Sequence, residues 1–168
     1  MKNPTNEVQG LFDLDGKKAI ITGGTRGLGF SMAEILAAAG AKLLLVGQRP
    51  DSVQEAIQRL SATYPNQIWG FAANVTNPDA VERMTRYAME TLGGIDILIN
   101  SAGINKRGPI ESLSLDDFRH VMDTNVTGTW LCSKATVPHM KEKKWGRIIN
   151  LASALGLVGL ANRSPYAT

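Results

Sequence analysis

Short apolar runs alternate with longer segments of helical periodicity along the chain, and this alternation limits the possible folds more than any other feature. Strands that alternate with helices of about 10–15 residues form βαβ units, which require a parallel sheet with helices on both faces. The predicted strands are Lys18–Thr22, Lys42–Val46, Ile68–Val75, Asp96–Asn100 and Arg147–Leu151. The predicted helices cover 28–39, 51–62, 78–92 and a long stretch from Ser114 or Asp116 to about Lys143. We therefore predict a single doubly wound α/β domain over residues 1–168.

Residue types that start or stop helices refine this prediction. Asn77 is a good N-cap, and Pro78 suits the first position of the helix that follows. Asp51 is expected to cap the helix after the second strand. Pro138 is expected to bend the long helix or to mark its last turns. Ser164, which precedes Pro165, is a plausible start for a last helix.

Composition and charge exclude several classes of protein. The chain has 168 residues, of which 43% are hydrophobic and 20% charged, as expected for a globular domain. Cys132 is the only cysteine, so an intrachain disulfide and a multi-cysteine metal site are both excluded, and we expect a buried apolar role for it. The net charge of +3 is weak evidence for a nucleic-acid partner. Met1–Glu7 has no apolar signal core, and no apolar run approaches membrane-spanning length. We expect a cytoplasmic protein without metal, membrane or nucleic-acid partners.

A glycine-rich turn lies directly between the first predicted strand and the first predicted helix. Its sequence, Thr22-Gly23-Gly24-Thr25-Arg26-Gly27-Leu28-Gly29, lets the backbone turn sharply and approach a pyrophosphate. The helix that follows would present free N–H groups to the anion. A phosphate-binding loop of the Gly-Lys-Ser/Thr type is excluded, because that tripeptide does not follow. The turn predicts a Rossmann-type dinucleotide site; the alternative is a turn required only for packing.

Several motifs together resemble the short-chain dehydrogenase/reductase family. The glycine turn is similar to the family's T-G-x-x-x-G-x-G pattern, and Asn100-Ser101-Ala102-Gly103 resembles its N-N-A-G motif with serine at the second position. Asn125 lies in a segment that resembles N-x-x-G, and Ser153 precedes Tyr166 by thirteen residues, the usual separation in the family. The resemblance extends from about Leu11 to Thr168.

The resemblance implies roles for three catalytic residues. Tyr166 would be the general acid/base, Ser153 would orient the substrate oxygen and Asn125 would hold a relay water, while hydride moves to or from nicotinamide. In the family a lysine four residues after the tyrosine assists it, and its place would lie two residues beyond Thr168. We expect the sequence to be the N-terminal portion of a longer enzyme. The C-terminal strands of that enzyme would lie outside this portion, and residues 1–168 alone should have little activity. The resemblance also implies a homo-oligomer, a dimer or tetramer that pairs through the long helix and the helix that Tyr166 begins.

The residue at the end of the second strand bears on the choice of nicotinamide cofactor. An acidic residue there would bind the ribose 2′-hydroxyl of NAD, but this chain has Gly47-Gln48-Arg49. Because Arg49 and Arg26 could bind a 2′-phosphate, we expect NADP in preference to NAD. The cofactor-binding residues predicted in this way are Gly23, Thr25, Arg26, Gly27, Leu28, Gly29, Gln48, Arg49, Asn74, Val75, Asn100, Ala102 and Gly103.

The substrate is less constrained by the sequence. The segments Leu11–Lys17 and Gly103–Pro109 look similar to sugar-acid dehydrogenases of the gluconate 5-dehydrogenase type, and Lys106 and Arg107 could attract a carboxylate. We expect a carbonyl or alcohol substrate such as gluconate or 5-ketogluconate. A 3-oxoacyl-thioester reductase of the same family and a dinucleotide-binding module without catalysis remain alternatives. Lone His120 and His139 show no metal-ligand spacing and are expected to be structural or exposed.

Overall fold

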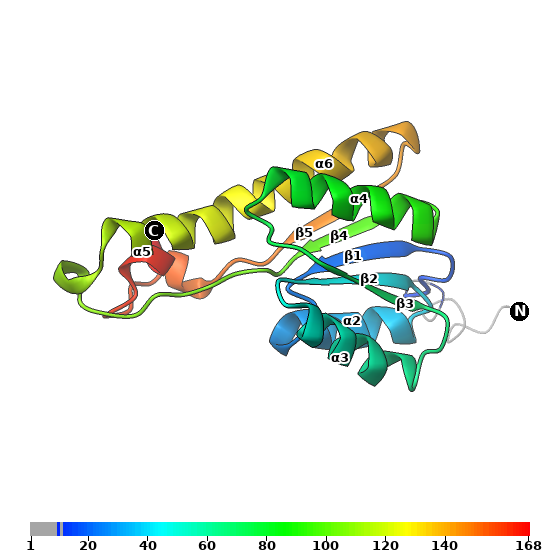
Figure 1. The fold of residues 1–168 in the computed structure, drawn as a ribbon, viewed down its shortest axis with the longest axis horizontal. Coiled ribbons are helices and arrows are strands. Elements are labelled where there is room, and N and C mark those ends of the chain that lie inside the picture. The colour runs from blue at the N-terminus through cyan, green and yellow to red at the C-terminus, as the bar shows by residue number, and fades with distance from the viewer. Residues whose placement is uncertain (1–9, 11) are drawn as a thin grey trace, which may run out of the picture.

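The computed structural model describes residues 10 and 12–168 and contains one five-stranded parallel sheet with strand order β3-β2-β1-β4-β5 (Figure 1). The expectations for Met1–Glu7 and for Leu11 lie outside the described residues. The strands are β1 (Lys18–Thr22), β2 (Lys42–Gly47), β3 (Ile68–Ala72), β4 (Ile97–Asn100) and β5 (Arg147–Asn150). The order reverses between β1 and β4, so the carboxyl ends of these two neighbouring strands diverge into separate loops, as in doubly wound sheets. The predicted fold class is confirmed.

Two layers of helices cover the sheet, and alternate residues of the strands contact one layer or the other. Helices α2 (Gly27–Ala38) and α3 (Pro50–Ser61) lie on one face, and α4 (Pro78–Leu92) and α6 (Gly128–Glu142) lie on the other (Figure 1). In β1, Ile21 packs in the core beneath α2 and α3, whereas Ile20 packs in the core beneath α4 and α6. Both side chains are fully buried. Such strands must be apolar on both faces, which explains their continuous apolar runs.

The predicted helix starts are partly confirmed. The side chain of Asn77 accepts a hydrogen bond from the N–H of Ala80 at 2.9 Å, as expected of an N-cap. Ser114 caps helix α5 (Leu115–Met122) and forms a reciprocal capping box with Asp117. The expectation for Asp51 is wrong, because α3 begins at Pro50 and Arg49 is its N-cap. Proline fixes a helical φ at this position, so the helix starts one residue before the expected cap.

The long predicted helix is present but not uniform. It consists of α5, a π-helical segment (η2, Asp123–Thr127) and α6 in continuous succession. In the π turn, the N–H of Gly128 bonds to the carbonyl of Asp123, five residues earlier. Pro138 lies inside α6, which continues to Glu142. Pro138 therefore lies in the last turns of the helix, as one of the two expectations had it, while the wider turn near Asn125 was not predicted.

Some strand ends and short helices differ from the prediction. β3 stops at Ala72 rather than Val75, because the Asn74 side chain accepts a bond from the N–H of Thr76 and turns the chain away from β2. β4 begins one residue later than predicted and β5 ends one residue earlier. The remaining short helices are η1 (Ile110–Ser112), η3 (Ala154–Gly156) and α7 (Ser164–Ala167). β5 forms one edge of the sheet, and all four of its residues are exposed. Within the described residues, no helix has the length and apolar character needed to cross a membrane.

Candidate active site

The candidate site lies at the carboxyl ends of β1 and β4, where the strand order reverses. In doubly wound sheets this position is the usual binding crevice. The glycine turn leaves β1 here, and the loop Ser101–Gly103 leaves β4 beside it. The hydroxyl of Thr22 accepts hydrogen bonds from the N–H groups of Ser101 and Ala102, both at 3.2 Å. One side chain therefore joins the two loops.

Three glycines of the turn are required by the space around them. A Cβ on Gly24 would lie 2.9 Å from the carbonyl oxygen of Ile21. Gly23 has φ +67°, and a Cβ there would lie 2.8 Å from the backbone N of Ala102. A Cβ on Gly29 would overlap the carbonyl of Gly23. Gly27 differs, because its φ is +55° but open space surrounds it. Gly23, Gly24 and Gly29 permit close packing, whereas Gly27 leaves the backbone open on the side of the cavity.

A cavity of about 890 Å³ extends from this turn toward α5 and α7. It brings together all three predicted catalytic residues, Asn125, Ser153 and Tyr166. It is also lined by most of the predicted cofactor residues, namely Gly23, Thr25, Arg26, Gly27, Leu28, Gly29, Gln48, Asn74, Val75, Ala102 and Gly103. Residues separated by more than 140 positions in the sequence thus share one cavity.

Asn125 fixes the wall of the cavity through both ends of its amide. Its Oδ1 accepts a bond from the N–H of Ile104 at 2.9 Å, and its Nδ2 donates to the carbonyl of Ile104 at 3.0 Å. The π-helical segment that contains Asn125 is thereby tied to the loop after β4. Thr129 adds a bond from its hydroxyl to the main-chain carbonyl of Asn125 at 2.8 Å.

Ser153 and Tyr166 lie on short elements that follow β5. The Oγ of Ser153 accepts a bond from the N–H of Leu155 at 3.2 Å at the start of η3. Tyr166 is half-buried in α7, and its N–H bonds to the carbonyl of Arg163 at 3.0 Å. The backbone of this segment is held by a bond from the N–H of Gly108 to the carbonyl of Asn162 at 3.2 Å.

Two predicted cofactor residues do not line the cavity. Arg49 directs its guanidinium to the hydroxyl of Ser52, with Nη2 and Nε at 2.8 and 3.1 Å from Oγ. Asn100 is buried, and its Nδ2 donates to Oδ1 of Asn150 at 2.9 Å and to Oγ of Ser133 at 3.2 Å. Asn100 therefore links β4 with β5 and α6 beneath the site. Asn74, which does line the cavity, has its Oδ1 bonded to the N–H of Thr76 at 3.1 Å.

The cavity also contains residues that were not predicted to bind cofactor or to take part in catalysis. They are Val46, Gly47, Ala73, Ser101, Ile104, Asn105, His120, Thr124, Thr129, Leu151, Ala152, Leu155 and Arg163. For Thr129 a signal was available, because it lies four residues after Asn125 and therefore on the same side of a helix. His120 and Thr124 do not share that side at the α-helical period, and the π-helical segment that changes this phase was not predicted. Arg163 lies in a loop, and no periodicity could have indicated where it points. No group of three or more potential metal ligands occurs in the described part of the chain.

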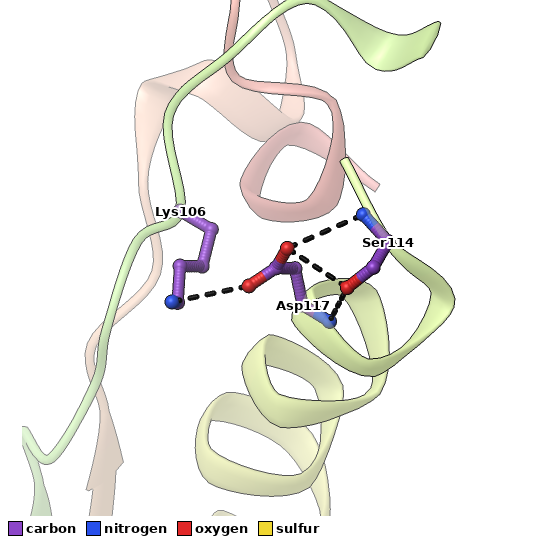
Figure 2. A network of polar contacts seen from close by, with 3 residues as sticks. All are labelled: Lys106, Ser114 and Asp117. Atoms are coloured by element: carbon purple, nitrogen blue, oxygen red, sulfur yellow. Dashed lines mark hydrogen bonds and ion pairs between the residues drawn. The ribbon is translucent and has the colours of Figure 1, made fainter. Parts of the chain in front are cut away.

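The basic residues of the loop after β4 do not line the cavity. Figure 2 shows Lys106 directed at Asp117, with its Nζ 3.1 Å from Oδ1. The other carboxylate oxygen of Asp117 accepts bonds from the N–H and hydroxyl of Ser114. The bond from Lys106 and those from Ser114 together lower the pKa of Asp117. Because its charge is balanced by Asp117, Lys106 is poorly suited to the expected role of attracting a carboxylate.

Cys132 shows the properties of a buried apolar side chain, as predicted. It is fully buried in the core beneath α4 and α6. Burial raises the pKa of its thiol to about 12. The thiol is therefore neutral near neutral pH and has no nucleophilic role in the site.

Comparisons with known proteins agree with this geometry. Residues 17–168 match the family model described as short chain dehydrogenase. The chain is 36% identical over 155 residues to the 3-oxoacyl-[acyl-carrier-protein] reductase FabG of Vibrio cholerae, covering 92% of this chain and 62% of that protein. It is 37% identical over 160 residues to the 2-dehydro-3-deoxy-D-gluconate 5-dehydrogenase of Formosa agariphila, covering 94% and 60%.

Solved structures extend the likeness to three dimensions. A structure from Agrobacterium tumefaciens, described as a proposed gluconate dehydrogenase, superimposes with a TM-score of 0.85 at 33% identity. The match covers 92% of this chain and 61% of that one. The chain thus spans about 60% of the length of the relatives it matches. With the glycine turn, Asn125, Ser153 and Tyr166 around one cavity, it belongs to the short-chain dehydrogenase family.

Proposed function

We propose that the protein is an NAD(P)-dependent oxidoreductase that transfers hydride between nicotinamide and a carbonyl or secondary alcohol. The observation that carries this proposal is the cavity that joins the glycine turn to Asn125, Ser153 and Tyr166. A dinucleotide fits the turn, because Gly27 leaves open space and the start of α2 presents free N–H groups. A bound nicotinamide cofactor supplies or accepts the hydride.

The side chains of the cavity would handle the proton. The hydroxyl of Tyr166 gives a proton to the carbonyl oxygen during reduction and takes it from the alcohol during oxidation. The Oγ of Ser153 accepts a bond from Leu155, so its own hydrogen is available to orient the same oxygen. Oδ1 of Asn125 has a second lone pair beside its bond to Ile104, and we assign the relay water to it.

We further propose a preference for NADP over NAD. Gly47 ends β2 and Gln48 follows it, and no carboxylate occurs among the described residues that line the cavity. Arg26 does line the cavity and offers a planar donor group to a 2′-phosphate. Since Arg49 is bonded to Ser52, the preference is assigned to Arg26.

Titration of the protein with NADPH and NADH, followed by cofactor fluorescence, tests the cofactor proposal. NADPH should bind about tenfold more tightly, and Arg26→Gln should remove most of this difference by weakening NADPH alone. Arg49→Gln is the matched control and should leave both affinities within about twofold. Tighter binding of NADH by the wild-type protein would refute the preference.

For the substrate we propose a sugar acid or polyol such as gluconate or 5-ketogluconate. A relative named as a 2-dehydro-3-deoxy-D-gluconate 5-dehydrogenase supports this choice, while another named as a 3-oxoacyl reductase supports reduction of 3-oxoacyl thioesters as the alternative. Oxidation of NADPH with 5-ketogluconate and with acetoacetyl thioester, measured side by side, separates the two. Tyr166→Phe should abolish turnover and retain NADPH binding. NADPH binding without turnover of any carbonyl would instead identify a non-catalytic dinucleotide-binding module.

We propose that the protein is a homo-oligomer that uses the α5–α6 helix. Phe118, Val126 and Trp130 recur at helical spacing there and are 36%, 54% and 57% exposed. Large apolar side chains gathered on one helix are typical of an interface. Light scattering after size exclusion tests this: Trp130→Glu should shift a dimer or tetramer to monomer, and a monomeric wild-type protein would refute it.

A further inference from the structure

The charges that line the cavity have one sign. Its ionisable side chains are Arg26, His120, Arg163 and Tyr166, and among the described residues around it there is no aspartate or glutamate. Two permanent cations thus face a cavity without a balancing anion. A cavity of this kind favours ligands that bring negative charge.

The two arginines belong to different parts of the cavity. Arg26 lies in the glycine turn between β1 and α2, where a dinucleotide phosphate would bind. Arg163 precedes α7 and is bonded through its carbonyl to the N–H groups of Tyr166 and Ala167, both at 3.0 Å. The cation at position 163 therefore accompanies the proposed acid/base residue.

The backbone around Arg163 is fixed before any ligand binds. Asn162 adopts φ +62°, and its carbonyl accepts the bond from Gly108. Pro165, two residues after Arg163, is buried. Preorganisation of this kind lowers the cost of ordering a binding group.

The guanidinium of Arg163 makes no ion pair or side-chain hydrogen bond with the residues that the structure describes. Other cations near the site differ, since Lys106 is paired with Asp117 at 3.1 Å and Arg119 with Asp116 at 3.7 Å. The half-buried Arg163 is therefore left with its planar set of donors available toward the cavity.

We infer that the substrate of the proposed reaction carries a carboxylate and that Arg163 binds it. A guanidinium binds a carboxylate through two parallel hydrogen bonds, which fixes orientation as well as position. With the carboxylate held there, the carbonyl or alcohol carbon would lie within reach of Ser153 and Tyr166. This inference rests on the proposed function, and it selects acids over neutral alcohols and places the recognition at Arg163 rather than at Lys106 or Arg107.

Calorimetric titration with two matched pairs of compounds tests the inference. D-gluconate is compared with D-glucitol, and 3-hydroxybutyrate with 1,3-butanediol, so that each acid is paired with an alcohol in which the carboxylate is replaced by a hydroxymethyl group. The titrations are done without cofactor and again with saturating NADPH. The wild-type protein should bind at least one acid about tenfold more tightly than its partner.

Variants then assign the preference to a residue. Arg163→Gln should remove it and Arg163→Lys should retain part of it, because lysine keeps the charge but loses the paired donors. Arg107→Gln, at an exposed position of the loop after β4, should retain it in full. Equal affinity for acid and alcohol in both pairs, or a preference that survives Arg163→Gln, would overturn the inference. So would an Arg163→Gln variant that weakens NADPH as much as the acid. Failure of NADPH to bind at all would count against the proposed function, and the titrations without cofactor would still decide the role of Arg163.

Discussion

The two ends of the cavity are built in different ways. The end at the glycine turn rests directly on the sheet, where Thr22 is only 1% exposed and Gly29 packs against Gly23. The end that contains Ser153 and Tyr166 lies on η3, α7 and the loops around them, beyond the sheet (Figure 1). Most residues from Leu151 to Asn162 are exposed. The first end is held by close backbone packing, and the second by a small number of hydrogen bonds.

This difference corresponds to two requirements of the proposed reaction, the binding of a cofactor and the binding of a substrate. A cofactor common to many enzymes can be bound by a rigid turn that tolerates little substitution. A substrate that differs between enzymes is bound by loops, which accept changes of sequence without loss of the core.

The largest predicted effect breaks the rigid end. Gly29→Ala places a methyl group against the carbonyl of Gly23 and should lower the free energy of unfolding by about 3 kcal/mol. Gly27→Ala is the matched control, because it has a positive φ but open space, and it should cost about 1 kcal/mol. Urea unfolding measures both. Equal losses in the two variants would show that conformation, and not packing, explains the glycines.

The second prediction removes the two hydrogen bonds by which Asn125 holds the loop after β4. Asn125→Ala leaves the N–H and carbonyl of Ile104 without their partners and should lower the free energy of unfolding by about 2 kcal/mol. Hydrogen exchange at the amide of Ile104 should accelerate markedly. Thr124→Ala removes a hydroxyl that bonds only within its own helix, to His120, and should have little effect on that amide. Unchanged exchange in Asn125→Ala would show that the loop does not depend on this bond.

The architecture could be predicted from the sequence because strands buried on both faces have continuous apolar runs, and these alternate with segments of helical periodicity. The apolar strands and the cap at Asn77 are local signals, and the structure confirms them. Of the two predicted starts of the long helix, Ser114 and Asp116, the structure selects Ser114 as the cap. The π turn was not predicted, and it contains Asn125, which bonds to Ile104, a contact between residues 21 positions apart that local spacing does not express. Likewise, the side-chain contact of Arg49 with Ser52 and the cavity position of Arg163 depend on tertiary geometry that no spacing rule expresses.

The third prediction tests whether water reaches the core between the sheet and helices α4 and α6, where Cys132 is buried. The thiol of Cys132 has a pKa raised from 9.0 to about 12 by burial, so only the unfolded chain loses this proton between those values. The stabilisation is complete below pH 9 and is lost as pH rises toward 12. The wild-type free energy of unfolding should therefore fall faster than that of Cys132→Ala, by up to about 1.4 kcal/mol per pH unit. Parallel curves for the two proteins would mean that water reaches the thiol.

The smallest predicted effect concerns the ion pair between Lys106 and Asp117. In Lys106→Ala, the pKa of Asp117 should rise toward its ordinary value, because its first stabilising partner is lost. The contribution of Asp117 to stability is present above that ordinary value and disappears as pH falls through the lower, folded-state value. A carbon-13 titration of the carboxylate detects the change, with Arg107→Ala as control. An unaltered Asp117 titration would show that Ser114 alone sets its pKa.

The pairing of β1 with β4 has a consequence for how the chain folds. Ile21 lies opposite Ile99, although two complete strand–helix units separate them in the sequence. During synthesis, one side of β1 can pair with β2 early, but its other side must wait until β4 has been made. The hydrogen bonds that the Thr22 hydroxyl accepts from the N–H groups of Ser101 and Ala102 form only then. The crevice between the loops after β1 and β4 is therefore a late product of folding, and β1 spends the interval with one edge open to pairing with other strands.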